Sequence, residues 1–134
     1  MKLKIKLFFL LIIILFIVVF NTACLSNNKN WVEFFYKNRN LYHQSAKIIL
    51  SKHKLFKMGT NYYPLEKQFR NLSSDKRALV YIKEDKITIE YGLTEGLLIY
   101  DSESIIYTED SEFLNKSYIK HQLIEDNWYY TMWD

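Results

Sequence analysis

The chain has 134 residues, of which 49% are hydrophobic and 17% aromatic, and its 18 basic and 15 acidic side chains give a formal net charge of +3. A single Cys excludes an internal disulfide, three Gly and one Pro exclude a collagen-like chain, and the aromatic content excludes full disorder. The length suits one ordinary globular domain.

The first 24 residues differ from the rest of the chain. Lys2, Lys4 and Lys6 precede an uncharged apolar run over residues 7–20, a layout typical of a signal peptide. At ~1.5 Å per residue this run spans about 21 Å as a helix, less than the ~30 Å thickness of the hydrocarbon core. We therefore expect export, with an uncleaved transmembrane anchor as the alternative. The three lysines favour a cytoplasmic N-terminus and place the remaining residues outside the cytoplasm.

The one cysteine, Cys24, lies four residues beyond the apolar run. Thr22 and Ala23 are similar to the last positions of a bacterial lipobox, in which the cysteine is acylated by a fatty acid and the chain is cleaved just before it. Asn21 departs from that pattern, which has Leu or another aliphatic residue at this position. We expect Cys24 to be the lipid attachment site of a membrane lipoprotein; ordinary cleavage and a signal anchor are the alternatives.

The apparent basicity belongs to this N-terminal segment. Residues 25–134 contain equal numbers of basic and acidic side chains, but residues 25–77 carry a net charge of +8 and residues 78–134 a net charge of −8. Folding can pair the two halves with each other, or it can leave a basic face and an acidic face.

A helix is expected at the start of the domain. Residues 25–30 form a short polar tether, and from Trp31 to about His53 the sequence has no Gly or Pro. Apolar side chains recur there at spacings of three, four and seven residues, which predicts one long amphipathic helix. Residues 57–61 suit a turn. Residues 62–70 are ambiguous, with Pro64 able to open a short helical turn.

The hydrophobic period changes from Ala78 onward, where short runs rich in Ile, Leu, Tyr and Trp alternate with polar turns. These runs predict strands at Leu79–Lys83, Ile87–Tyr91, Leu97–Asp101, Ile105–Thr108, Tyr118–Ile124 and Trp128–Trp133. Connections this short allow antiparallel neighbours only. We expect a single α+β domain over residues 31–134, in which the long helix packs on an antiparallel meander of about five to six strands.

Several motifs within residues 62–133 carry a resemblance: Tyr63-Pro64-Leu65-Glu66, Leu79-Val80-Tyr81-Ile82, Ile87-Thr88-Ile89-Glu90-Tyr91 and Asn127-Trp128-Tyr129-Tyr130. This pattern resembles a group of small uncharacterised bacterial proteins that are exported or lipoprotein-like. Their meander ends in a similar tryptophan-tyrosine strand. The resemblance implies a place in the bacterial cell envelope and no known activity.

The sequence contains no strong motif for catalysis or for a ligand. It has no Gly-x-Ser-x-Gly elbow, no paired Cys, no zinc or calcium motif and no glycine-rich phosphate loop, so it indicates no metal, no cofactor and no small-molecule ligand. Export and a neutral domain disfavour nucleic acid as a partner. His43 and His53 are the candidates for a catalytic base, should a carboxylate lie near either of them.

The last predicted strand is rich in aromatic residues on both of its faces. Alternation places Trp128 with Tyr130 on one face and Tyr129 with Trp133 on the other. Because Tyr and Trp are enriched in binding hot spots, Tyr129 and Trp133 are the candidate residues for contact with a partner. The alternative is that residues 109–117 shield them.

These observations predict a non-enzymatic domain, tethered to the membrane outside the cytoplasm, that binds a protein partner. An immunity-type role and a role in envelope assembly both fit. Two alternatives are a small envelope enzyme that uses a helix histidine and a carboxylate, and a signal-anchored structural protein.

Overall fold

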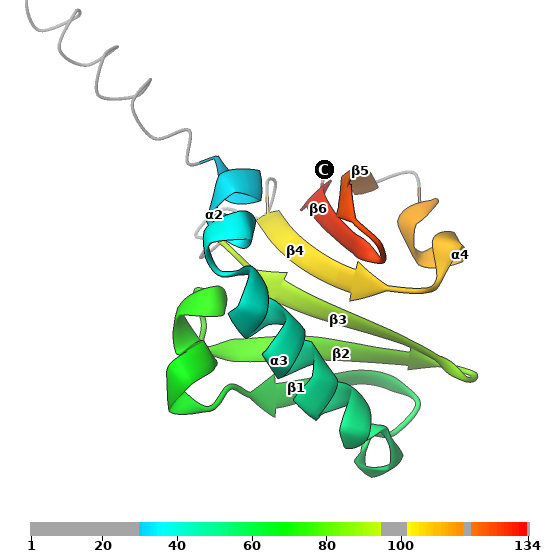
Figure 1. The fold of residues 1–134 in the computed structure, drawn as a ribbon. Helices are drawn as coiled ribbons and strands as arrows, with labels where there is room; N and C mark the ends of the chain where they lie inside the picture. The colour runs from blue at the N-terminus through cyan, green and yellow to red at the C-terminus, as the bar shows by residue number, and fades with distance from the viewer. Residues whose placement is uncertain (1–29, 95–101, 117–118, 134) are drawn as a thin grey trace, which may run out of the picture. The chain divides into compact units, whose positions relative to one another are not determined.

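Six antiparallel strands form one sheet, and the first two described helices, over residues 31–51, cover one of its faces (Figure 1). The structure, a computed structural model, describes residues 30–94, 102–116 and 119–133. The expected signal segment and Cys24 lie outside these residues. Within the described part of the chain, no helix has the length and apolar character needed to cross a membrane.

The α+β fold class is confirmed, with a sheet of six antiparallel strands in the order β1-β2-β3-β4-β6-β5. The strands are β1 (Gly59–Pro64), β2 (Arg77–Lys83), β3 (Lys86–Gly92), β4 (Ser102–Thr108), β5 (Ile119–Glu125) and β6 (Trp128–Trp133). The helices are α2 (Trp31–Lys37), α3 (Arg39–Ser51) and α4 (Ser111–Leu114), with 3-10 turns η1 (His53–Leu55) and η2 (Lys67–Leu72).

In place of the single long helix expected from Trp31 to about His53, the structure has two helices that meet at Asn38. The Asn38 side-chain amide donates to the Phe34 carbonyl at 2.9 Å, and its backbone has φ −112° and ψ 14°. A side chain that bonds the backbone in this way competes with the helical hydrogen bonds. The break leaves the apolar pattern intact, because Phe35 and Tyr42 on either side of it are both fully buried.

The first strand was not predicted, because residues 57–61 suit a turn and Pro64 suits the opening of a helix. The chain does turn just before the strand, where the Asn61 side chain accepts from the Lys57 N–H at 3.1 Å and donates to the Lys57 carbonyl at 2.7 Å. Gly59, the strand's first residue, has a φ of +94°, a conformation that glycine adopts without strain. Pro64 is tolerated in β1 because it ends a strand that lies at the sheet's edge. The predicted strand at Leu97–Asp101 lies outside the described residues.

The sheet is not a simple meander, because β6 pairs with β4 and leaves β5 at the edge. Burial explains this order. β6 is buried on both faces, with Trp128 on the core side and Thr131 on the opposite side, and therefore suits an interior position. The middle of β5 is polar and exposed, as expected of an edge strand. The connection through α4 is long enough to pass over one strand position.

The main core lies between the sheet and helices α2 and α3, and Trp128 is at its centre. Its indole is 1% exposed and contacts rings from four other elements, with centroid distances between 5.2 and 6.1 Å. These rings belong to Phe35, Tyr42, Tyr91 and Tyr107. A hydrogen bond of 2.8 Å from the Trp31 indole to Glu103 joins the first turn of α2 to β4.

Replacing Trp128 by Ala should therefore lower the free energy of unfolding by about 3–5 kcal/mol, the usual cost of emptying so large a buried site. Urea unfolding of the full chain in detergent would measure it. Leu55→Ala, at a side chain that is 79% exposed, is the control and should change stability by no more than about 0.5 kcal/mol. If Trp128→Ala does not fold, Ile89→Val in the same core should still cost about 0.5–1.5 kcal/mol. Equal stability of all variants would contradict this description of the core.

Candidate functional site

The sheet face opposite α2 and α3, called the outer face below, combines a small apolar cluster with a row of buried polar side chains. The α4 residues Phe113 and Leu114 pack with Ile106 and Ile119 in the apolar cluster. The buried polar residues belong to the three central strands and are Thr88, Glu90, Ser104, Thr108 and Thr131. Polar groups at this depth need hydrogen-bond partners, and the hydroxyls of Thr88 and Thr108 lie 2.6 Å apart.

A cavity of about 310 Å³ lies on the outer face between β1, β2, β3 and the α4 segment. The rings of Tyr81 and Phe113, whose centroids are 5.3 Å apart, form an apolar wall. Five charged residues also line the cavity: Lys83, Lys86, Lys116, Asp110 and Glu112.

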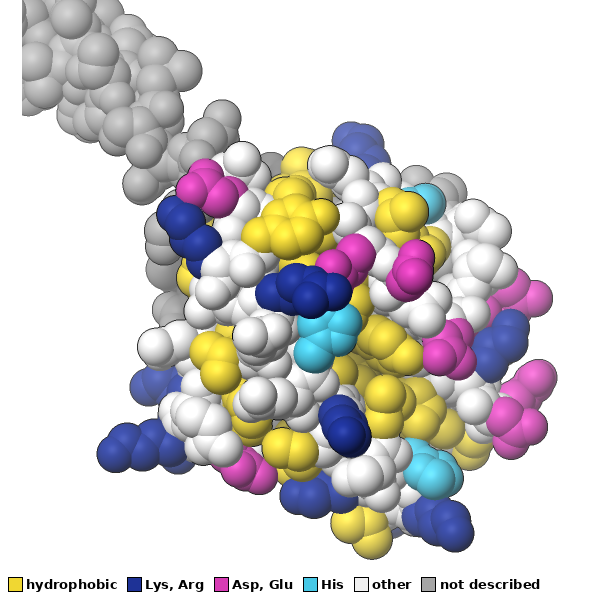
Figure 2. Space-filling model, viewed as in Figure 1, with side chains coloured by type: hydrophobic (Ala, Val, Ile, Leu, Met, Phe, Trp, Pro, Cys, Tyr) yellow, Lys and Arg dark blue, Asp and Glu magenta, His cyan; other side chains and the backbone are white. Residues whose placement is uncertain are grey.

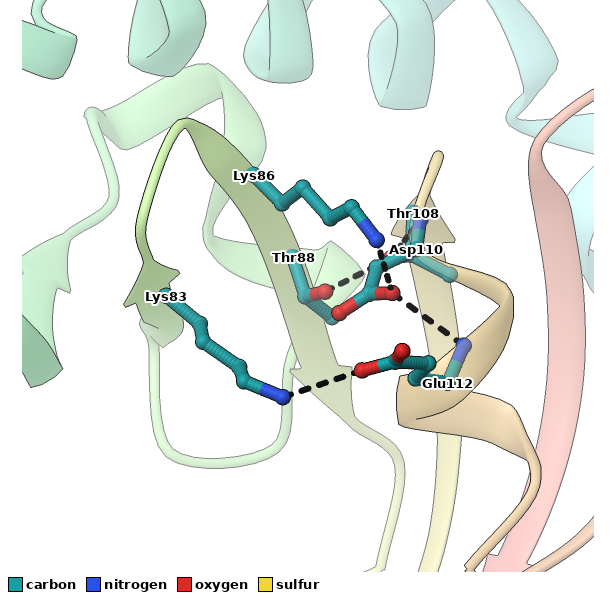
Figure 3. Close-up of polar contacts among 6 residues, drawn as sticks. All are labelled: Lys83, Lys86, Thr88, Thr108, Asp110 and Glu112. Atoms are coloured by element: carbon teal, nitrogen blue, oxygen red, sulfur yellow. Dashed lines mark hydrogen bonds and ion pairs between the residues drawn. The ribbon is translucent and has the colours of Figure 1, made fainter.

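Two of these lysines stand directly opposite each other across the β2–β3 hairpin, because Lys83 and Lys86 are paired in the strand register. Like charges in this position repel and destabilise a strand pair. Figure 3 shows both side chains reaching from the hairpin toward the carboxylates of Asp110 and Glu112 at the start of α4. The ion-pair distances are 3.0 Å for Lys86 with Asp110 and 3.0 Å for Lys83 with Glu112.

The two carboxylates differ in how firmly they are held. Asp110 is the N-cap of α4, and one of its oxygens accepts both from Lys86 and from the backbone N–H of Glu112 at 3.1 Å. The Lys86 ammonium, together with this N–H, holds the pKa of Asp110 below its usual value, although burial acts in the opposite direction. The side chain of Asp110 is 5% exposed, whereas that of Glu112 is 68% exposed.

Sequence reasoning placed Lys83 at the end of a predicted strand and treated the other three as polar turn residues. The local signals were Lys83 and Lys86 flanking a two-residue turn, and Asp110 two residues ahead of Glu112 as a helix cap. Nothing in the sequence indicated that the two segments meet.

A second cavity, of about 220 Å³, is lined in part by Glu90, a buried carboxylate of β3 on the outer face. Its oxygens accept from the Tyr81 hydroxyl at 2.8 Å and from the Ser104 hydroxyl at 2.6 Å. Burial raises the pKa of Glu90, and the two hydroxyl donors offset this only in part.

The opposite face of the domain carries a contact between a helix histidine and a carboxylate. His43 Nε2 lies 2.5 Å from one oxygen of Glu125, and Arg39 Nε donates to the other at 2.7 Å. Burial tends to raise the pKa of Glu125, but the hydrogen bonds from Arg39 and His43 outweigh it and hold the pKa below its usual value. Figure 2 shows a histidine directly beside a basic side chain on this face, with an acidic side chain on the other side of that basic group. The contact joins the basic and acidic halves of the sequence and fixes the β5–β6 hairpin on α3.

The other candidate base, His53, lies with Glu84 and Asp85 at a cavity of about 210 Å³ near the end of the β2–β3 hairpin. Its Nδ1 is 3.1 Å from the carbonyl of Leu50 in the last turn of α3. A backbone contact of this kind orients the ring but supplies no acid or base.

Tyr129 and Trp133, the sequence candidates for partner contact, both lie on the outer face and are partly buried. Trp133 packs edge to face on Phe113 of α4, with ring centroids 6.1 Å apart, as the shielding alternative expected. Tyr129 stands opposite Leu123 in the strand register, and Leu123 is 58% exposed. The structure thus separates the two candidates: Trp133 lies against α4, and Tyr129 borders an exposed apolar residue.

The chain matches no protein-family model, no curated protein and no solved structure. The resemblance of residues 62–133 to exported bacterial proteins stays a prediction.

The buried Glu90 gives the domain a specific dependence on pH. Because its pKa is raised in the folded state, the folded state binds the proton more tightly than the unfolded state. The contribution of Glu90 to the free energy of unfolding is therefore greatest below the ordinary pKa of 4.5. It declines as the pH rises through the raised pKa of the folded state. Glu90→Gln should remove that decline, so that the variant gains stability relative to the wild type as the pH rises above 4.5.

Urea unfolding of both proteins at several pH values would measure the difference between their free energies of unfolding. The titration of all other groups cancels in this difference. Glu66→Gln, at an exposed side chain, is the control and should follow the wild type throughout. A difference between Glu90→Gln and wild type that is independent of pH would contradict the raised pKa.

Proposed function

We propose that this protein is a lipoprotein-type, membrane-tethered domain outside the cytoplasm that binds a protein partner and is not an enzyme. The tether is residues 25–30, anchored in the membrane through an acylated Cys24 after cleavage just before it. The proposal for the N-terminus depends on the sequence pattern of residues 1–24.

The observation that carries the binding proposal is an exposed apolar and aromatic surface on an edge hairpin. Leu123 projects from β5 on the outer face, and the His121 ring packs edge to face on Tyr129 at 6.0 Å. We call His121, Leu123 and Tyr129 the hairpin surface. Exposed apolar side chains next to a tyrosine are typical of the centre of a protein interface.

The position of β5 suggests the kind of contact. It is one edge of the sheet, and an edge strand presents backbone N–H and C=O groups that a further strand can bind. The partner would add an extended segment along β5 and cover the hairpin surface with an apolar side chain. This is the β-augmentation mode of recognition, in which the backbone supplies affinity and side-chain pockets supply specificity.

The alternative, a small envelope enzyme, is favoured by one contact, that of His43 with Glu125. Both oxygens of Glu125 are engaged, one by His43 and one by Arg39. The carboxylate thereby holds a hairpin on a helix, and this is a role in docking two elements.

Lipidation at Cys24 is tested by metabolic labelling with a fatty acid, followed by separation of membrane and soluble fractions. Wild type should carry the label and stay with the membrane, whereas Cys24→Ala should lose the label because the thiol that accepts the acyl chain is absent. Cys24→Ser is the matched control, since its hydroxyl keeps size and polarity without the thiol. Label retained by either variant would contradict acylation at Cys24.

Partner binding is tested with a photoreactive amino acid at position 121 in cells. A discrete crosslinked product should form there, and Leu123→Glu should reduce its yield by about tenfold, because a buried charge opposes the apolar contact. Leu55→Glu is the matched control, since Leu55 is also exposed but precedes the opposite edge strand, and it should leave the yield unchanged. No product at position 121, or an equal loss in both variants, would contradict the hairpin surface.

A further inference from the structure

The cavity beside α4 has features that the proposed protein contact does not use. Its charged rim and its aromatic wall lie at the β2–β3 hairpin, whereas the hairpin surface belongs to β5 and β6. We propose that this cavity binds a small organic carboxylate with an apolar body, whose carboxylate takes the place of Glu112 beside Lys83.

The first argument is the balance of charge. Three lysines and two acidic residues line the cavity, so its net charge is positive. The hydrogen bonds to Glu112 and Asp110 raise the pKa values of Lys83 and Lys86, which keeps both ammonium groups charged. A cation is disfavoured here, and in the described part of the chain no three His, Cys, Asp or Glu side chains lie together as metal ligands would.

The second argument is that the Glu112 carboxylate can move away from its lysine, whereas the Asp110 carboxylate cannot. Asp110 is buried, caps α4 and neutralises Lys86, so its removal would expose a helix end and an unpaired charge. Glu112 pairs with Lys83 at 3.0 Å while both side chains remain about two-thirds exposed, and such surface pairs are weak. A ligand carboxylate can therefore exchange with Glu112 and restore the same contact to Lys83.

The third argument is the wall of the cavity. Tyr81 and Phe113 present ring surfaces beside the charged rim, and the Nζ of Lys116 lies 4.4 Å from the centre of the Phe113 ring. A volume of about 310 Å³ falls at the lower end of the range for small-molecule pockets. A ligand with a single ring or a short aliphatic chain fits both the volume and the chemistry.

The experiment uses 3-phenylpropionate as the probe, titrated into the ¹⁵N-labelled full chain in non-ionic detergent and followed by amide chemical shifts of residues 83, 86, 112 and 113. Saturable shifts are expected. Lys83→Gln should weaken binding by about fivefold or more, because it removes the cation that receives the carboxylate. Glu112→Gln should tighten binding by about threefold, because it removes the competing carboxylate.

The matched controls come from an exposed ion pair on α2. Lys37 and Glu33 lie 2.7 Å apart and are exposed to a similar extent, so Lys37→Gln and Glu33→Gln should leave the affinity unchanged. If Lys83→Gln fails to fold, Glu112→Gln still tests the proposal, because its expected effect has the opposite sign.

The ligand class is tested by three further probes. The neutral 3-phenylpropanol should bind more weakly than the acid, and inorganic phosphate should not reproduce the shifts. A short peptide ending in Phe, as the free acid and as the amide, distinguishes a free acid from a peptide C-terminus as the source of the carboxylate. No saturable binding, equal binding of alcohol and acid, equal binding of phosphate, or weaker binding to Glu112→Gln would each overturn the proposal.

Discussion

The rest of the structure depends on the packing of aromatic rings around Trp128. This side chain belongs to β6 but contacts Phe35 of α2, Tyr42 of α3, Tyr91 of β3 and Tyr107 of β4. Burial of so much ring surface is the largest favourable contribution that a domain of this size has available. It also places β6 in the interior of the sheet and thereby leaves β5 at the edge. The position of the surface proposed for partner binding thus follows from the packing of the core on the other face.

Sequence patterns predicted the parts of the fold that depend on local periodicity. The alternation in Ile87–Tyr91 and the aromatic run in Trp128–Trp133 both lie within observed strands, and the helical stripe around Tyr42 packs on the sheet. Two features were missed because hydrophobic periodicity does not show them. In each, one interaction outweighs the preference of the local sequence. The Asn38 side chain interrupts the helix through one hydrogen bond to Phe34, and β1 pairs with β2 across a segment whose Gly and Pro are more typical of turns.

The outer-face cavity was beyond sequence reasoning for a different reason. Its charged residues come from the β2–β3 hairpin and from the α4 segment, and Lys83 is separated from Glu112 by 29 residues. Each residue taken alone is a polar residue in or beside a turn, with no motif spacing. In the sequence, Glu90 is only the polar position of an alternating strand. That pattern gave no sign that the side chain is buried on the outer face. Tyr129 and Trp133 could be named as candidates for partner contact because their signal, aromatic alternation within one strand, is local.

The opposed lysines of the β2–β3 hairpin impose a requirement on a distant part of the chain. A strand pair that ends in two ammonium groups needs counter-charges, and α4 supplies them together with the cover for Ile106 and Ile119. A grafted helix with the same apolar pattern but without Asp110 and Glu112 would seal the apolar cluster and still leave the hairpin end under repulsion. In a redesign of this domain, residues 83–86 and 110–113 therefore have to be changed together, although the two segments lie far apart in the sequence.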